Sequence, residues 1–227
     1  MSEQRLTGKR VLITQSEDFM GPALCEVFRE QGATVIADAS ALAEPGRAEQ
    51  VVADAGRVDV LVANLGVPAP FTRAQEVQDD EWRHVFAHMV DPLPRLFRSV
   101  LPQMLEREAG KIVLMGSASA LRGMKRASTY SAARGAQLAY VQAVGVEVAP
   151  KNVQVNAIAQ NFVDNPTYFP AEIQENPKFQ QRLRNEVPAG RLGTPREDAL
   201  FAAFLASDEV NFLVGQAIPF SGGWATR

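Results

Sequence analysis

The sequence predicts a doubly wound α/β fold, in which helices cover both faces of one parallel sheet. Short apolar runs alternate along the chain with longer amphipathic runs. The apolar runs do not alternate with polar residues, which is typical of strands that are buried on both faces. The chain has 227 residues, 46% of them apolar, so we expect a single domain over residues 1–227 with a sizeable core.

The first elements are a strand, a helix and a second strand. Arg10–Thr14 (RVLIT) is predicted as the first strand, and a helix is predicted at 21–31. Pro22 suits the first turn of that helix, and Gly32 suits its end. Thr34–Ala37 follows as the second strand.

Four more apolar runs are predicted as strands, with helical patterns between them. The strands are Val58–Ala63 (VDVLVA), Lys111–Gly116 (KIVLMG), Val153–Ile158 and Ala217–Phe220. The helices are predicted at 45–56, 79–107, 127–149 and 195–206. Sheets of this kind bind ligands beyond the carboxyl ends of their strands, so we expect the site there.

Residues 159–187 are rich in proline, asparagine and aromatic residues. This segment suits an insertion over the strand ends, where it would act as a lid or a pocket wall. A plain surface excursion fits the same composition equally well.

The composition argues against several classes of protein. The chain has 23 basic and 26 acidic residues, a net charge of −3, whereas nucleic-acid partners usually require a basic face. The single cysteine, Cys25, cannot form an intramolecular disulfide or a cysteine metal cluster, and is interpreted as a buried hydrophobic residue. Residues 1–5 are polar, and no run approaches the ~18 apolar residues of a membrane span. We therefore expect a soluble, cytoplasmic protein with no membrane partner.

Tyr130 and Arg134 are the first candidate pair for catalysis. Four residues apart on a helix, they share one face, roughly 5–6 Å apart at Cβ. A permanent cation beside a phenol favours the phenolate and lowers its pKa, so Arg134 would make Tyr130 a better base. Tyrosine and arginine at this spacing also form ordinary surface contacts.

Ser117 strengthens this interpretation because it follows a predicted strand, at the sheet edge where ligands bind. Ser117 would hydrogen-bond a substrate hydroxyl while Tyr130 takes its proton. Ser119 and Ser128 compete for this role by position.

These residues resemble the short-chain dehydrogenase/reductase superfamily along nearly the whole chain. Val60–Gly66 looks like its Asn-Asn-Ala-Gly strand, Leu101–Met104 matches its helix before the catalytic strand, and 188–195 with Gly222–Gly223 match its C-terminal segment. Ser117 and Tyr130 fall on the catalytic serine and tyrosine of that superfamily. The resemblance implies a Rossmann-like fold.

The departures from the superfamily concern the dinucleotide site. Its catalytic lysine, which also grips the nicotinamide ribose, becomes Arg134, and its glycine-rich phosphate loop becomes 14–21, where only Gly21 remains. Phe19 would fill the space of a pyrophosphate, and Glu17 and Asp18 would repel it. About twenty residues separate the second and third strands, which looks too short for a complete strand–helix unit around an adenine.

Two further departures concern single residues. Asp38 remains a weak candidate for a ribose hydroxyl. The helix asparagine through which the superfamily relays protons becomes Met89.

Together these changes resemble the halohydrin dehalogenases, a cofactor-free branch of the superfamily. The resemblance implies conversion of vicinal haloalcohols into epoxides with release of halide. It also implies ring opening of epoxides by azide, cyanide or nitrite, no cofactor and no metal, and a homotetramer. Its catalytic residues would be Ser117, Tyr130 and Arg134.

The same resemblance places the halide between Phe19 and the loop after the fifth strand. That loop contains Gln160, Asn161, Phe162 and Val163, and its backbone N–H groups and aromatic edges suit an anion. Phe162 stands where the family commonly has tyrosine, and Leu65 stands where some members have an acid that helps the proton leave.

Other features have less specific interpretations. His84 and His88 lie four apart, but without further ligands we expect packing or a solvated face rather than a metal. Trp224 is either a pocket wall or a subunit contact.

Two alternative functions stay open. One is a nicotinamide-dependent oxidoreductase with an altered phosphate loop. The other is a non-catalytic binding or sensor protein.

Overall fold

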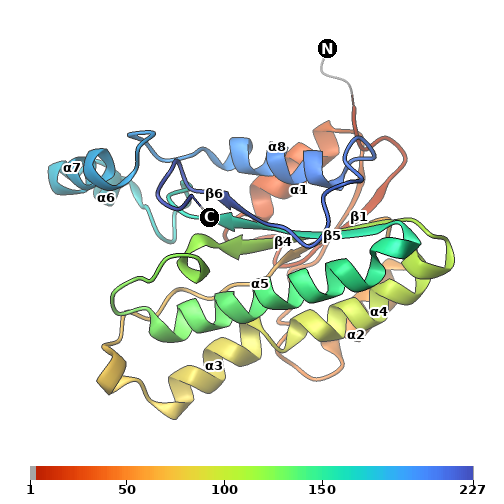
Figure 1. Ribbon diagram of the computed structural model, residues 1–227, viewed down its shortest axis with the longest axis horizontal. Helices are drawn as coiled ribbons and strands as arrows, with labels where there is room; N and C mark the ends of the chain where they lie inside the picture. The colour runs from red at the N-terminus through yellow and green to blue at the C-terminus, as the bar shows by residue number, and fades with distance from the viewer. Residues whose placement is uncertain (1–3, 227) are drawn as a thin grey trace.

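The computed structural model describes residues 4–226 and contains one parallel sheet of six strands (Figure 1). The strand order is β2-β1-β3-β4-β5-β6. The strands are β1 (Arg10–Ile13), β2 (Thr34–Ala37), β3 (Val60–Asn64), β4 (Gly110–Ser117), β5 (Val153–Gln160) and β6 (Ala217–Phe220). The predicted fold class and the six predicted strands are confirmed. Successive strands are added on one side of β1 up to β2, and on the other side from β3 onward. Only β2 lies beyond β1 in this sheet, whereas the usual dinucleotide-binding order has two strands there.

Helices cover both faces of the sheet. Helices α1 and α8 pack against each other on one face, and α2, α4 and α5 cover the other face, with α3 packed on α5 (Figure 1). The helices are α1 (Gly21–Glu30), α2 (Arg47–Ala55), α3 (Asp79–Met89), α4 (Pro92–Glu106), α5 (Ser128–Val148), α6 (Ala171–Gln174), α7 (Pro177–Glu186) and α8 (Pro195–Ala206). Short 3₁₀ turns lie at Ala74–Glu76, Ala118–Ala120 and Ala149–Lys151. Within residues 4–226, every helix is too short or too polar to span a bilayer.

The prediction of one helix over 79–107 was wrong, because the chain breaks between α3 and α4. Proline has no N–H, so Pro92 cannot continue the ladder of helical hydrogen bonds. The N–H groups of Val90 and Asp91 instead both donate to the carbonyl of Phe86. The break lies beside α5 and leaves the carbonyl of Met89 free for another donor.

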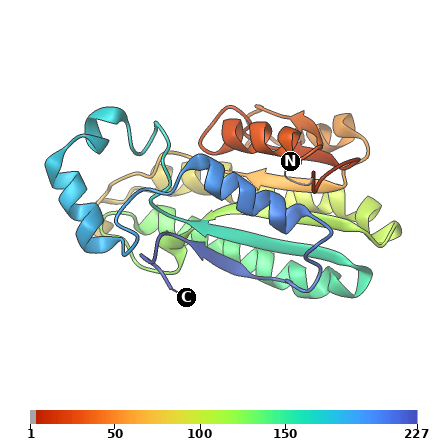
Figure 2. The same cartoon turned by 90° about the horizontal axis from the view of Figure 1, so that it is seen from above.

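Residues 159–187 form a separate layer beyond the sheet. The strands point toward this segment, which carries the short helix α6 and the longer helix α7 (Figure 1). Seen from above, α6 and α7 project past the carboxyl ends of the strands (Figure 2). An insertion over the strand ends and a plain surface excursion were both left open for this segment, and its two helices were not predicted in a stretch rich in proline and asparagine.

Asp198 on α8 is a buried acid with no partner. Its side chain has no exposed surface, and neither carboxyl oxygen has a hydrogen-bond partner among the described residues. Burial raises the pKa of Asp198 to about 7. The folded protein therefore holds this proton to a higher pH than the unfolded chain, whose aspartates titrate near ~3.9. The resulting stability is complete below about pH 4 and is lost as the pH rises to about 7.

We expect Asp198→Asn to remove this pH dependence. Between pH 4 and 7.5 the free energy of unfolding of the native protein should fall relative to the variant by up to about 4 kcal/mol. Urea unfolding of both proteins at several pH values measures the difference. The exposed Asp54→Asn is the control, and parallel pH curves for the native protein and Asp198→Asn would contradict the expectation.

Candidate active site

A cavity of about 420 Å³ lies at the carboxyl ends of the strands. Its walls come from the loop after β1, the ends of β3, β4 and β5, the start of α5, and the segment with α6 and α7. The lining residues are Phe19, Met20, Asn64, Ala69, Phe71, Gly116, Ser117, Met124, Tyr130, Arg134, Gln160, Asn161, Phe162, Val163, Asn165, Thr167, Tyr168, Phe169, Ile173, Phe179 and Arg182. All eight residues predicted for catalysis and halide binding therefore line one cavity. Because α6 and α7 supply one wall, the segment 159–187 forms a pocket wall rather than a plain surface excursion.

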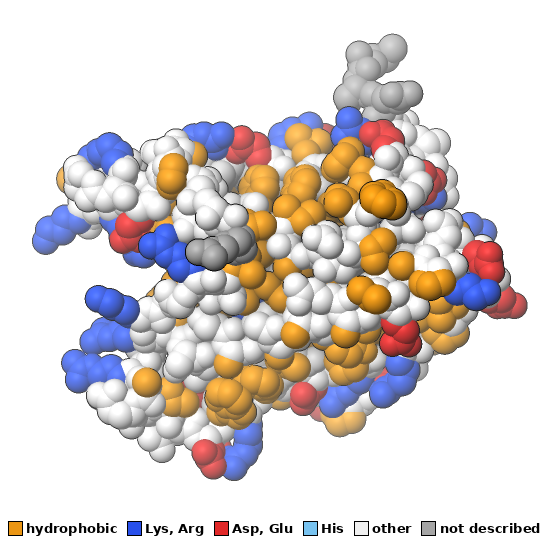
Figure 3. Space-filling view, viewed as in Figure 1, with side chains coloured by type: hydrophobic (Ala, Val, Ile, Leu, Met, Phe, Trp, Pro, Cys, Tyr) orange, Lys and Arg blue, Asp and Glu red, His pale blue; other side chains and the backbone are white. Residues whose placement is uncertain are grey.

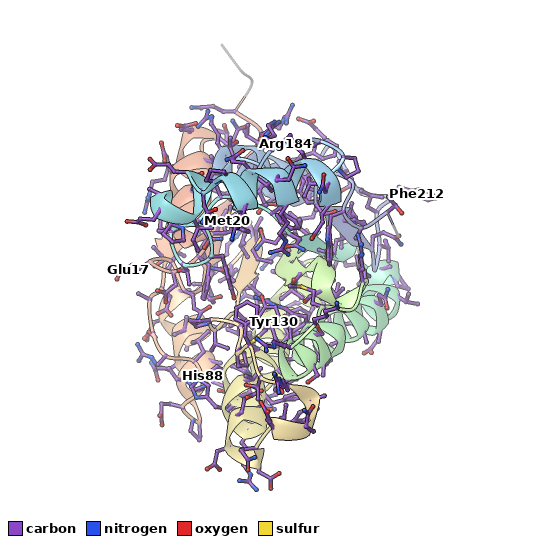
Figure 4. The ribbon with its side chains drawn as sticks, turned by 90° about the vertical axis from the view of Figure 1, so that its left-hand side faces the viewer. Glu17, Met20, His88, Tyr130, Arg184 and Phe212 are labelled. Carbon is purple, nitrogen blue, oxygen red and sulfur yellow. The ribbon has the colours of Figure 1, made fainter. Side chains whose placement is uncertain are left out.

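Figure 4 looks at this end of the molecule. Tyr130 lies near its centre, between α7, which carries Arg184, and α3, which carries His88. Glu17 lies at the outer edge of the same view. The cavity therefore opens on the face where the sheet ends.

Ser117 is the last residue of β4, and its pairing with Gln160 sets it next to the end of β5. Its Oγ lies 3.0 Å from the Oγ of Ser119 and accepts a hydrogen bond from the Ser119 N–H at 3.2 Å. Of the three candidate serines, only Ser117 lines the cavity. Ser119 is buried behind it, and Ser128 is exposed at the start of α5.

Tyr130 and Arg134 lie on the buried face of α5, as their spacing predicted. The guanidinium carbon of Arg134 is 5.0 Å from the centre of the Tyr130 ring. Tyr130 is 7% exposed and Arg134 is 5% exposed, so bulk water screens their interaction little.

Backbone carbonyls hold Arg134 in this position. Its Nη1 donates to the carbonyls of Leu65 at 2.9 Å and Met115 at 3.0 Å, which follow or belong to adjacent strands. It also donates to Oε1 of Gln137 at 2.9 Å. These acceptors are neutral oxygens, so they fix the guanidinium without cancelling its charge.

Phe19 enters the cavity from the loop after β1. Its ring stacks on Tyr168 with centroids 6.0 Å apart, and its backbone is left-handed, with φ of 49°. The side chain of Gln15 both donates to the Gly66 carbonyl and accepts from the Gly66 N–H, at 3.0 and 2.7 Å. The amide of Asn64 donates to the carbonyls of Gln15 and Asp18. This loop is therefore bound to the end of β3, with Phe19 facing the cavity.

The loop after β5 presents both free and occupied polar groups. Oε1 of Gln160 and Nδ2 of Asn161 are buried with no partner in the described part of the chain. The N–H of Phe162 donates to Oδ1 of Asn161 at 2.9 Å, and the N–H of Asn161 donates to the carbonyl of Phe220. Phe162 is also left-handed, with φ of 54°, a conformation that is uncommon outside glycine. An anion at the Phe162 N–H would have to displace the Asn161 oxygen.

Tyr168 also belongs to the site, although no role was predicted for it from the sequence. Its hydroxyl donates to the Val67 carbonyl and accepts from the Ala69 N–H, each at 3.1 Å. Burial and the neighbouring Tyr130 hydroxyl raise the pKa of Tyr168. Tyr168 therefore remains a neutral phenol beside Tyr130, and it ties the loop after β3 to the segment after β5.

Two other candidates lie outside the cavity. Trp224 packs behind Phe162, with ring centroids 6.1 Å apart, and stacks under Arg122. His84 and His88 stack on each other on α3, with ring centroids 4.2 Å apart. In residues 4–226 no group of three or more histidine, cysteine or acidic residues is arranged to hold a metal.

Comparison with known sequences assigns the chain to a superfamily. The profile of a family described as enoyl-(acyl carrier protein) reductase matches residues 7–225. The chain belongs to the short-chain dehydrogenase/reductase superfamily. The 3-oxoacyl-[acyl-carrier-protein] reductases FabG of Vibrio harveyi and Thermotoga maritima are each 30% identical to it, and the match covers 96% of this chain and 98% of theirs.

Solved structures of the superfamily have the same architecture. A protein named "Dehalogenation enzyme" superposes with a TM-score of 0.91 at 30% identity, over 97% of this chain and 100% of its own. A 3-oxoacyl-[acyl-carrier protein] reductase with bound NAD from Brucella melitensis superposes with a TM-score of 0.87 at 23% identity, over 99% and 94%. The second likeness concerns the fold alone.

Superfamily membership raises the question of whether a nicotinamide dinucleotide fits. A pyrophosphate needs close approach to a glycine-rich loop and free N–H groups at the helix start. In this chain Phe19 belongs to that loop and lines the cavity, while the N–H groups of Asp18 and Gly21 donate to carbonyls of the same loop. Glu17 and Asp18 are exposed acids on the same loop. These residues do not fit a dinucleotide.

We expect Tyr168→Phe to destabilise the protein by about 1–3 kcal/mol, because two backbone groups lose their partner. Tyr140→Phe is the matched control, since the Tyr140 hydroxyl makes no hydrogen bond within residues 4–226 and its ring packing on Phe97 remains. Urea unfolding of both variants measures the difference. Equal destabilisation would show that the Tyr168 hydroxyl does not hold the two loops together.

Proposed function

We propose that this protein is a halohydrin dehalogenase, which converts vicinal haloalcohols to epoxides without a cofactor and releases halide and a proton. The observation that carries the proposal is a serine, a tyrosine and an arginine gathered in one cavity that Phe19 also lines. The similarity to a protein named "Dehalogenation enzyme" supports it.

In the proposed mechanism, Ser117 and Tyr130 bind the substrate hydroxyl. Tyr130, which lies beside the Arg134 guanidinium, accepts the hydroxyl proton. The alkoxide oxygen then forms a bond to the neighbouring carbon as the carbon–halogen bond breaks, and the halogen leaves as halide. Nucleophile and leaving group belong to one molecule, so the enzyme needs to orient them rather than bring them together.

The halide would lie between Phe19 and the loop 160–163. The unpartnered Nδ2 of Asn161 is a free donor there, the N–H of Phe162 could donate if the halide displaced the Asn161 oxygen, and the edges of aromatic rings carry partial positive charge. In the reverse direction the same place would hold azide, cyanide or nitrite. Loss of the tyrosine hydroxyl at Phe162 removes one further donor.

The surface around the cavity suits small anions. In Figure 3 the edge of the molecule that carries α6 and α7 is indented, and lysine and arginine side chains lie on both sides of the indentation. The loop 121–127 alone carries Arg122, Lys125 and Arg126 and no acid. Basic side chains at this edge would favour the approach of a small anion from that side, although the whole chain is negative.

Replacement of the proposed base should abolish the reaction. We expect Tyr130→Phe to lower halide release from a small bromoalcohol by about a thousandfold or more, with the circular dichroism spectrum retained. Tyr140→Phe on the same helix is the control. Turnover by Tyr130→Phe within tenfold of the native rate would remove Tyr130 from the mechanism.

The FabG relatives favour a second candidate, an NAD(P)-dependent reductase. Thermal unfolding in the presence of NADH, NADPH, bromide or azide separates the two. We expect the anions, and neither nucleotide, to raise the melting temperature, because a ligand stabilises the state that binds it. Stabilisation by NADPH, together with reduction of a 3-oxoacyl thioester, would favour the reductase instead.

The homotetramer that the resemblance implies is part of the same proposal. Size-exclusion chromatography with light scattering tests it without any assumption about activity.

A further inference from the structure

Gln137 is a fully buried amide one turn beyond Arg134 on α5, and the proposed mechanism gives it no role. Its Oε1 accepts from Nη1 of Arg134 at 2.9 Å. Its Nε2 donates to the carbonyls of Met89 at 2.6 Å and Leu65 at 3.3 Å. Every polar atom of this side chain is therefore used.

The surroundings of Gln137 fix the orientation of its amide. Two carbonyl oxygens face Nε2, and a guanidinium N–H faces Oε1. Turning the amide over would set its oxygen against two carbonyls and its NH₂ against a donor, which leaves buried groups without partners. The Gln137 amide therefore has one stable orientation.

The break between α3 and α4 creates this anchor. The Met89 carbonyl lies at the end of α3, where the chain turns into Pro92. The next backbone donors bond elsewhere, since Val90 and Asp91 donate to Phe86, and Leu93 donates to Val90. Gln137 satisfies this carbonyl, otherwise unpaired among the described residues, and is held by it, so the helix break is linked to the guanidinium of Arg134.

The chemistry of an amide also matters here. A neutral oxygen can orient the guanidinium while the positive charge remains available to Tyr130. A carboxylate in the same place would form an ion pair and cancel much of that charge. All three Nη1 acceptors are neutral, namely Leu65, Met115 and Gln137.

We propose that Gln137 is a positioning residue for the base Tyr130. Gln137 is anchored at the break between α3 and α4, holds the Arg134 guanidinium against Tyr130, and leaves the charge of Arg134 unpaired. This inference rests on the proposed function for its catalytic consequence. Its electrostatic part concerns Tyr130 and Arg134 whether or not any haloalcohol is turned over. The ionisable groups that line the cavity around Tyr130 are Arg134, Tyr168 and Arg182.

The first test is Gln137→Met, which keeps the side-chain length and removes both polar atoms. We expect kcat for halide release to fall about tenfold with KM nearly unchanged, because substrate contacts are retained. We also expect the acidic limb of the rate–pH profile to move to higher pH. Gln142→Met, on the exposed face of the same helix, is the matched control. A Gln137→Met variant with native kcat and a native pH profile would overturn the proposal.

A spectroscopic readout separates this inference from the proposed function. The chain has three tyrosines, so the tyrosinate absorbance near ~295 nm can be followed during an alkaline titration. Burial raises the pKa values of Tyr140 and Tyr168, and Tyr130→Phe identifies which absorbance step belongs to Tyr130. In Gln137→Met that step should move to higher pH, even if no haloalcohol is a substrate. A step that stays in place, with only the melting temperature lowered, would show that Gln137 is merely structural.

Gln137→Glu keeps both the side-chain length and an acceptor oxygen, and it provides the test if Gln137→Met does not fold. The ionised carboxylate would pair with Arg134, so the Tyr130 step should move to higher pH. Gln142→Glu adds the same charge on the exposed face as a control. An unshifted Tyr130 step in Gln137→Glu would overturn the proposal.

Discussion

The guanidinium of Arg134 joins β3, β4 and α5 at one buried point, and the geometry of the site depends on that junction. A buried cation is costly unless hydrogen bonds replace its water. The Leu65 and Met115 carbonyls supply two of them, both to Nη1, from the ends of two adjacent strands, whereas Nε has no partner among the described residues. Parallel strands end at the same edge of a sheet, so this arrangement needs no special loop. Tyr130 then lies one turn before Arg134, against a cation whose position the sheet fixes.

The loop after β1 is the second constraint, because it determines what the cavity can hold. Gln15 binds both backbone groups of Gly66, and a side chain on Gly66 would come within 3.2 Å of the Phe19 ring. Phe19, Gly66 and Arg134 are therefore packed as a unit. Phe19 and Phe162 both have left-handed backbones and both line the cavity, and strained residues of this kind often mark functional sites.

The sequence predicted the sheet well because strands buried on both faces are continuous apolar runs, as in Lys111–Gly116. It also predicted that the eight candidate residues would lie at one edge of the sheet, because they lie at or after strand ends or near the start of a helix there. It failed at 79–107, where the apolar pattern continues across a break that Pro92 imposes. Gln137 was missed for a different reason. A glutamine within a helix has no local signal for a role that depends on carbonyls 48 and 72 residues away.

Likeness of fold does not choose between the reductase and the dehalogenase, because both kinds of relative superpose along the whole chain. Our proposal rests on the site instead. A reductase must hold two phosphates and a ribose, and therefore needs open backbone at the loop after β1. A dehalogenase needs a base, a hydroxyl donor and a place for one small anion. In this chain Phe19 lines the cavity from that loop, and Ser117, Tyr130 and Arg134 lie together in the same cavity. The retained groups are those that act on a hydroxyl proton, and the altered ones are those that would bind a nucleotide, which is why we propose the dehalogenase rather than the reductase.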